Sequence, residues 1–408
     1  MRTMIFVFFL LGAVLSEPPR TKIMYGSSEN VKKGIAHIAE SGTINAFGIL
    51  KTKVIHRIYG GHFGPVNIIA KMEGIDYSDV ISRYINSEEN QVIVYVFVGA
   101  RNGKPEGLCD STSDDGCKEI YITRSIDDGK TWSFPVIIRR DSMSDLVQRT
   151  FPSLAYDRVT GKIYMAYGRE VKEEGKETFN IGMVEMGPED VAFSDEKIVG
   201  LNFNDLLEEP WSHPKLTITK PKENDTVFHL LVKGGVDATN EVFYGRSTDG
   251  KYWTMTKVDE AEADKHHSIS IAALGAVGDK NVYFAHTTDK NTWLYFSDDN
   301  GENWSEPKKI ESGAKLQFLK VCGKEETHGV MISFFQEDEE KSHDFKYFKK
   351  LEEEEIGEHK PFTELDKLKA LPMFDCISDD PNNVFYSAVT SYGSSVLFAM
   401  HKIIFEDT

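Results

Sequence analysis

Short apolar segments rich in β-branched and aromatic residues follow one another along the whole chain. Three of them span residues 119–123, 241–244 and 292–296, and a polar, turn-forming stretch follows each. Segments of this length and composition, bounded by Gly, Asp, Asn and Ser, are typical of β-strands. Helical spacing of apolar residues is confined to residues 204–209 and 363–370. The pattern therefore predicts an all-β protein, with these two segments as short helices in loops.

A turn motif directly follows each of those three strands. It reads S-I-D-D-G-K-T-W at residues 125–132, S-T-D-G-K-Y-W at residues 247–253 and S-D-D-N-G-E-N-W at residues 297–304. Ser and Asp side chains can bond the backbone of a tight turn, Gly allows the positive φ that the turn needs, and Trp packs beneath the hairpin. We interpret the copies as structural hairpin tips. Their shared positions are Ser125, Asp127, Gly129, Trp132, Ser247, Asp249, Gly250, Trp253, Ser297, Asp299, Gly301 and Trp304.

The spacing of the motif predicts repeating sheets. The second and third copies lie about 50 residues apart, whereas the first and second are separated by more than twice that distance. Repeats of this length indicate propeller blades, and the long gap predicts a degenerate blade between the first two copies. A further degenerate blade is expected at residues 329–348. The strands at residues 384–400 are expected to complete the last blade with an N-terminal strand from about residues 40–70. We predict a six-bladed β-propeller, with seven blades as the alternative.

The three motifs, known as Asp boxes, resemble those of the sialidase superfamily, which includes bacterial exo-sialidases and trypanosomal trans-sialidases. The resemblance spans roughly residues 77–402. It implies one sialidase-like propeller domain over residues 17–408. Asp boxes also occur in secreted propellers with other roles, so the function has to be argued from the site residues.

The segment before the first Asp box carries the closest match to sialidases. In that family an Arg-bearing segment, a strand that ends in Arg, an Asp-bearing loop and the box follow in this order. The resemblance assigns Arg83 to the grip on the substrate carboxylate, Arg101 to the arginine that closes the next strand, and Asp114 to the acid/base role, with Asp115 and Asp110 as alternates. The acid/base carboxyl would need a raised pKa to protonate a leaving oxygen. Because Asp is a common turn former, a solvated acidic loop is the other interpretation.

The segment F-Y-S-A-V at residues 385–389 resembles the family's Tyr-Ser-Ser-Leu, which implies that Tyr386 is the nucleophile. An ordinary strand tyrosine is the other interpretation. The chain departs from the family because Lys233 and Lys290 stand where two further arginines are expected, and Lys grips a carboxylate less well than the Arg fork does. The acid expected shortly after Pro214 is also missing. Without that base, a phenol with a pKa of about 10 is a poor nucleophile.

The N-terminus predicts where the protein is located, and the net charge limits the class of partner that it binds. Residues 1–16 combine a basic start, a short apolar stretch and small residues, which is typical of a signal peptide. We therefore expect a secreted protein that does not span a membrane after cleavage. In that setting Cys109 and Cys117 lie close enough in sequence to form a disulfide within one loop. The net charge of −18 argues against nucleic acid. No metal-ligand spacing is found, so neither a metal nor a cofactor is expected.

These observations favour a secreted, sialidase-like, glycan-directed propeller that is catalytically impaired and binds a glycan or sialoglycoconjugate. The alternative is an active exo-α-sialidase, a retaining glycoside hydrolase that cleaves terminal sialic acid through Tyr386. A secreted propeller that binds protein partners is a third hypothesis. An enzyme needs the acid that activates the tyrosine, whereas a binding protein does not.

Overall fold

The computed structural model describes most of the chain from residue 20 to residue 404. The described ranges are 20–26, 31–39, 43–59, 62–85, 90–100, 118–138, 147–173, 176–202, 212–234, 241–258, 268–288, 291–312, 314–322, 329–336, 343–348, 358–359, 370–380, 383–392 and 395–404. Within these ranges every regular element is a β-strand, so the all-β prediction is confirmed for them. The two expected helices fall largely outside these ranges. No helix in the described part is long and apolar enough to cross a membrane.

The strands form seven consecutive four-stranded units, one of which gains a fifth strand. The units contain β2 (Val31–Ile38), β3 (Ile44–Leu50), β4 (Lys53–Tyr59) and β5 (Asn67–Lys71); β6 (Asp76–Ile85), β7 (Asn90–Ala100), β8 (Lys118–Ser125) and β9 (Val136–Ile137); β10 (Val147–Tyr156), β11 (Ile163–Glu173), β12 (Lys176–Met186) and β13 (Lys197–Ile198); β15 (Ser212–Lys222), β16 (Asp225–Gly234), β17 (Glu241–Ser247) and β18 (Tyr252–Lys257), with β14 (Gly200–Asn202) added beside β18; β19 (Ser268–Ala272), β20 (Val282–Thr287), β21 (Asn291–Ser297) and β22 (Lys308–Ser312); β23 (Ala314–Cys322), β24 (Gly329–Gln336), β25 (His343–Phe348) and β26 (Glu358–His359); and β27 (Ala370–Asp380), β28 (Asn383–Tyr392) and β29 (Ser395–Ile404) with β1 (Arg20–Gly26).

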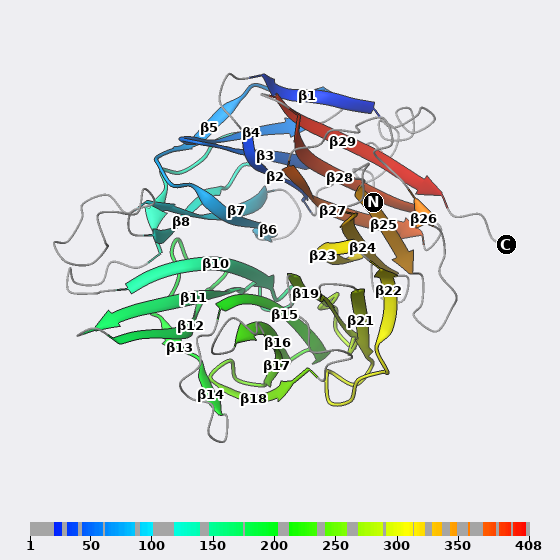
Figure 1. The fold of residues 1–408 in the computed structure, drawn as a ribbon. Coiled ribbons are helices and arrows are strands. Elements are labelled where there is room, and N and C mark those ends of the chain that lie inside the picture. The colour runs from blue at the N-terminus through cyan, green and yellow to red at the C-terminus, as the bar shows by residue number, and fades with distance from the viewer. Residues whose placement is uncertain are drawn as a thin grey trace.

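These units are arranged in a ring (Figure 1). The first strand of each unit contacts the first strand of the next, in the order β2, β6, β10, β15, β19, β23 and β27, and β27 contacts β2 again. By hydrogen bonding the described strands form six sheets, because a short parallel pair between β2 and β27 joins two units into one eight-stranded sheet. The predicted number of six blades therefore matches the number of hydrogen-bonded sheets. The alternative of seven blades matches the number of first strands in the ring.

The two ends of the chain meet in the eight-stranded sheet, as the sequence suggested, but in a different arrangement. Residues 40–70 supply β3, β4 and most of β5 rather than a single strand. The strand that pairs with β29 is β1, in antiparallel register from Arg20↔Met400 to Gly26↔Ser395. The N-terminal contribution to this sheet therefore begins earlier in the chain than expected and contains more strands.

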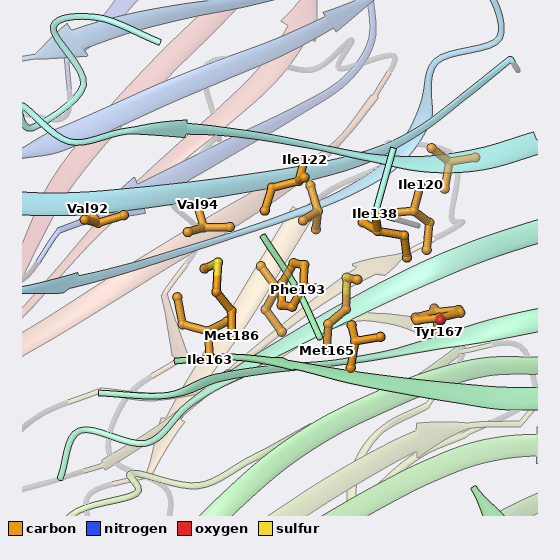
Figure 2. Packing of buried hydrophobic residues seen from close by; sticks show 14 residues of the cluster. Val92, Val94, Ile120, Ile122, Ile138, Ile163, Met165, Tyr167, Met186 and Phe193 are labelled. Carbon is orange, nitrogen blue, oxygen red and sulfur yellow. The ribbon is translucent and has the colours of Figure 1, made fainter. Parts of the chain in front are cut away.

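The core lies between neighbouring units. In β7 the whole run Val92–Val98 is at most 2% exposed, as expected for a strand covered on both faces. Figure 2 shows one such layer, in which Val94 and Ile122 of one unit pack against Met165 and Met186 of the next. Burial of apolar side chains at these interfaces is the main force that holds the units together.

Polar contacts between first strands add a second link around the ring. Asp79 Oδ2 accepts the N–H of Leu154 at 2.7 Å. Ser153 Oγ accepts the N–H of Leu216 at 3.0 Å, and Ser270 Oγ accepts that of Leu319 at 3.2 Å. Each bond runs from the first strand of one unit to that of the next, so it satisfies a backbone donor that the sheet itself leaves unpaired.

The three Asp boxes form tight turns with one hydrogen-bond plan. In each box the serine Oγ accepts the N–H of the box glycine, at 2.8 Å for Gly129, 2.9 Å for Gly250 and 2.8 Å for Gly301. The aspartate carboxylate accepts further backbone N–H groups of the same turn. All three glycines have positive φ (88°, 68° and 73°). The serine and aspartate of each box are therefore hydrogen-bonded within their own turn, as expected of a structural motif.

Candidate functional site

The two ends of the ring differ in what lies there. Strand β6 ends at Ile85, which pairs with Asn90, and β8 ends at Ser125, close to that same turn. The Asp box that follows β8 therefore lies at the end of the ring where first strands end, which we call the box face. The opposite end, where first strands begin, is called the start face.

Three neighbouring first strands are bulged near the start face. Their pairing register is interrupted at Tyr77 in β6, at Phe151-Pro152 in β10 and at His213-Pro214 in β15. The bulged Tyr77, Phe151 and His213 have positive φ, at 24°, 55° and 52°. For residues with a Cβ this conformation costs roughly 1–3 kcal/mol, and a following proline disfavours it further. Strain of this kind is concentrated at functional sites.

The side chains of these bulged residues form one cluster, which we call the aromatic trio. The centroids of Phe151 and His213 lie 3.6 Å apart with the rings tilted by 31°. Tyr77 lies edge-on to Phe151 at 4.3 Å, and its centroid is 6.4 Å from that of His213. All three residues are only half-buried. The bulges therefore bring aromatic groups from three units together where solvent reaches them.

Two lysines flank the trio. Lys215 follows His213 by two residues, and Lys233, at the end of β16, pairs with Ser212 just before His213. Lys233 is only 7% exposed. Burial and then the charge of Lys215 lower the pKa of Lys233 to about 8. Two ammonium groups that disfavour each other's charge form a suitable site for an anion, because an anion relieves that repulsion.

Asp79 on β6 interacts electrostatically with lysines from two other units of the ring. Burial raises the pKa of its carboxyl group. Four weaker influences lower that pKa without reversing the rise: the backbone N–H of Leu154, the charge of Lys215, the backbone N–H of Val80 and the charge of Lys320. Lys215 lies on β15 and Lys320 on β23, so both lysines are within electrostatic reach of a carboxyl on β6.

No family model matches the chain, and no curated protein matches it. Among solved structures, the chain is similar to Hadza microbial sialidase Hz136, with a TM-score of 0.55 and 11% identity over 90% of this chain and 74% of that chain. It is also similar to the intramolecular trans-sialidase from Ruminococcus gnavus, with a TM-score of 0.50 and 11% identity over 82% and 95% of the two chains. The chain has a sialidase-like β-propeller fold. Trypanosoma rangeli sialidase gives a TM-score of 0.51 and 9% identity over 94% of this chain and 60% of that chain.

In this sialidase-like propeller, Arg83 lies near the box face. The residue is 2% exposed. Its guanidinium donates to three carbonyl oxygens of the neighbouring unit, those of Gly161 at 2.7 Å and of Gly187 and Pro188 at 2.8 Å. Lys233 lies at the start face, so the structure does not bring these two sequence-predicted site residues together. In this position the side chain of Arg83 links two neighbouring units by hydrogen bonds.

Tyr386 lies in β28, where its backbone pairs with Cys376 and His401. It is close to the Asn383 end of that strand, which is the box-face end, because β27 and β28 are joined there. At Tyr386 the structure describes the backbone alone. Four further sequence-predicted features, Arg101, Asp114 with its alternates, Lys290 and the Cys109–Cys117 pair, lie outside the described residues, as does the segment 1–16.

An arginine that the sequence interpretation did not select is the centre of a buried ion cluster. Arg149 of β10 donates to Glu119 at 3.0 Å and to Glu196 at 3.2 Å, and Glu196 also accepts from Arg169 at 3.1 Å and from Tyr167. Burial lowers the pKa of Arg149, but the two carboxylates outweigh it and raise that pKa. The cluster joins two units of the propeller, and breaking one member would leave a buried charge uncompensated.

The aromatic trio was also missed from the sequence, although a signal was present. Proline is unusual inside a strand and marks edges and bulges. The dipeptides Phe151-Pro152 and His213-Pro214 therefore indicate bulges that present an aromatic residue. In the described part of the propeller no group of three or more His, Cys, Asp or Glu side chains is arranged to hold a metal ion.

Proposed function

We propose that this sialidase-like propeller is a secreted protein that binds an acidic glycan at its start face. The observation that carries the proposal is the pair Lys215 and Lys233 beside the aromatic trio, because it combines a site for a carboxylate with apolar surface. Ligand sites of this kind are largely apolar with a few placed polar groups.

The structural neighbours support an acidic sugar as the ligand. One is a trans-sialidase in complex with oseltamivir carboxylate, and another is a sialidase in complex with the inhibitor DANA. Sialic acid carries a carboxylate, which the two lysines can hold as point charges. In this proposal, Lys233 keeps its predicted role in substrate binding, and Lys215 is added to it.

The proposal favours binding over hydrolysis. A tyrosine nucleophile needs an adjacent base, and none was found at the expected position after Pro214. Arg83, which the resemblance assigned to the carboxylate, donates from both terminal nitrogens to carbonyl oxygens at the other end of the ring. An active exo-α-sialidase that uses Tyr386 is the competing outcome of the test.

Two assays on the purified mature protein separate these outcomes. The first measures release of a fluorogenic leaving group from an α-sialoside by the wild type and by Tyr386→Phe, which removes only the phenol oxygen. The second measures binding to a glycan array. We expect no release from either protein and retention of sialylated glycans by both. Release that is lost in Tyr386→Phe would establish the hydrolase, and absence of both release and glycan binding would overturn the glycan-directed function.

A further inference from the structure

The chain contains two sequons, the short sequences that accept an N-linked glycan in a secretory pathway, and the fold uses them differently. They are Asn224-Asp225-Thr226 and Asn303-Trp304-Ser305. A sequon needs an asparagine and, two residues later, a serine or threonine, with any residue except proline between them. A glycan is bulky and solvated, so a folded protein carries it on an asparagine that faces solvent. The surroundings of each asparagine therefore decide between the two sequons.

Asn303 is a structural member of the third Asp box. Its backbone N–H donates to Asp299 Oδ1 at 2.9 Å, and its side-chain Nδ2 donates to Asp299 Oδ2 at 2.6 Å. Thr131 has the same position in the first box and makes the same two bonds to Asp127, at 2.8 Å from its N–H and at 2.6 Å from its hydroxyl. A side-chain donor at this position is thus part of the turn, which explains Asn303 without a glycan.

A glycan on Asn303 would compete with the box. It would replace one of the two hydrogens on Nδ2 and place a bulky ring against the carboxylate of Asp299, to which that nitrogen donates. The next residue, Trp304, lies edge-on to Tyr244 at 4.8 Å and to Phe284 at 4.6 Å, so the asparagine is also fixed from the other side. Because Asn303 and Asp299 are four positions apart, their bonds need no distant part of the chain in order to form.

Asn224 lies at the tip of a hairpin that projects into solvent. Strand β15 ends at Lys222 and β16 begins at Asp225, and these two residues pair across the two-residue turn that contains Asn224. Asn224 is exposed, and the side chains of Lys222 and Asp225 are 82% and 54% exposed. From Lys215, near the start face, β15 runs about 20 Å to Lys222 at the box face. A glycan on this tip therefore leaves the start face open.

The threonine of the same sequon anchors the base of the hairpin. Thr226 Oγ1 accepts from Lys220 Nζ at 3.0 Å and donates to Asp157 Oδ2 at 3.1 Å. Lys220 and Asp157 form an ion pair at 3.0 Å whose two side chains are completely buried. Breaking such a pair would leave a buried charge uncompensated. These contacts use Thr226 and not Asn224, so the folded hairpin keeps them when Asn224 carries a glycan.

We infer that Asn224 is an N-glycosylation site and that Asn303 stays unmodified, so that the mature protein carries one N-linked glycan, at its box face. The donor is an oligosaccharide linked to a lipid diphosphate, which the secretory pathway supplies. Nδ2 of Asn224 attacks C1 of the first sugar, the C1–N bond replaces the C1–O bond, the diphosphate leaves with the electron pair, and Nδ2 releases one proton. The inference rests on the secretion that is part of the proposed function.

Peptide mass spectrometry on the full chain, secreted by a eukaryotic host under its own N-terminus, tests the assignment. Peptide N-glycosidase in heavy-oxygen water converts a glycan-bearing asparagine into an isotope-labelled aspartate, so the label marks the modified position. The variant Asn224→Gln removes the acceptor from the exposed tip. The matched control is Asn303→Thr, which removes the other sequon and copies the Thr131 donor of the first box.

We expect label at Asn224 and none at Asn303. Glycosidase treatment should increase the gel mobility of the wild type and of Asn303→Thr by the same amount, and should leave Asn224→Gln unchanged. Secreted wild type with no label at Asn224, label at Asn303, or a mobility change that persists in Asn224→Gln would each overturn the assignment while acidic-glycan binding stands. Folded protein that accumulates in the cytosol would overturn both the glycosylation site and the secretion in the proposed function.

Discussion

The box face and the start face of the ring use the same backbone conformation in opposite ways. At the box face, the positive φ angles of the Asp boxes fall on glycine and, in two boxes, also on Asp128 or Asn300, and the box serine accepts the glycine N–H, as at Gly129 and Gly301. At the start face, positive φ occurs in Phe151 and His213, both directly before a proline. One end of the propeller places positive φ on glycine, Asp and Asn, and the other places it on Phe151 and His213 before a proline, where it costs more free energy.

The difference teaches where function is to be sought in a propeller with recognisable repeats. The repeated motif is the easiest feature to find in the sequence, yet its serine and aspartate already bond the backbone of their own turn. In the proposed function, the groups that meet a ligand lie at the other end, on bulges without a repeated signature. Three experiments sharpen this comparison, from the largest expected effect to the smallest.

The largest effect is expected from acid, which should destabilise the box face through buried histidines. His56 Nδ1 accepts the indole N–H of Trp132 at 3.2 Å, so its Nε2 proton is donated to Asn45 Oδ1 at 2.8 Å, and the ring is neutral. Burial lowers the pKa of His56 to about 3, and burial followed by the charge of Arg246 lowers that of His229 to about 3.

Because these pKa values are depressed in the folded state, the stability that the histidines contribute is complete above pH 6.5 and is lost as the pH falls from about 6.5 towards 3. Between pH 7 and pH 5 the two together should cost about 4 kcal/mol of unfolding free energy. Urea unfolding at both pH values measures this. His56→Gln should remove about half of the loss, whereas the exposed His62→Gln should not. Equal pH dependence in wild type and His56→Gln would contradict the assignment.

A smaller effect is expected from the box glycines. A Cβ at Gly301 would overlap the hydroxyl of Tyr244, and its φ is 73°. Gly278 has a φ of 86° with nothing within 4 Å of its Cβ position, so it isolates the backbone contribution. Gly278→Ala should cost about 1 kcal/mol and Gly301→Ala about 3 kcal/mol, measured by urea unfolding. Equal costs would mean that the box does not pack against the preceding unit.

Much of the fold was predictable because its signals are local. The strands around the Asp boxes and the turn chemistry of Ser125 and Asp127 follow from residues adjacent in sequence. The N-terminal strands were predicted less well, since residues 40–70 were expected to give one strand and β1 was not predicted at all. The partner of β1 lies at Ser395–Ile404, and a pairing over such a separation leaves no local pattern.

The site was less predictable than the fold because its geometry is tertiary. Arg83 has the position in sequence that a carboxylate-binding arginine would have, yet its register in β6 directs it to the box face, onto the carbonyl of Gly161. Tyr77, Phe151 and His213 are far apart in sequence and meet only when three units close into a ring. The Phe-Pro and His-Pro dipeptides show where bulges occur, but not that their side chains converge.

The most direct test of the central claim, that the start face binds an acidic glycan through its lysines, is the affinity for methyl α-sialoside compared with its neutral methyl ester. Titration calorimetry on the wild type, Lys233→Met and the control Lys222→Met makes the comparison, since Lys222 is paired with Asp225 at the box-face end of β15. The account predicts that the wild type and the control bind the acid about tenfold more tightly than the ester, and that Lys233→Met binds both equally. Equal affinity of the wild type for acid and ester, or full preference for the acid in Lys233→Met, would contradict it.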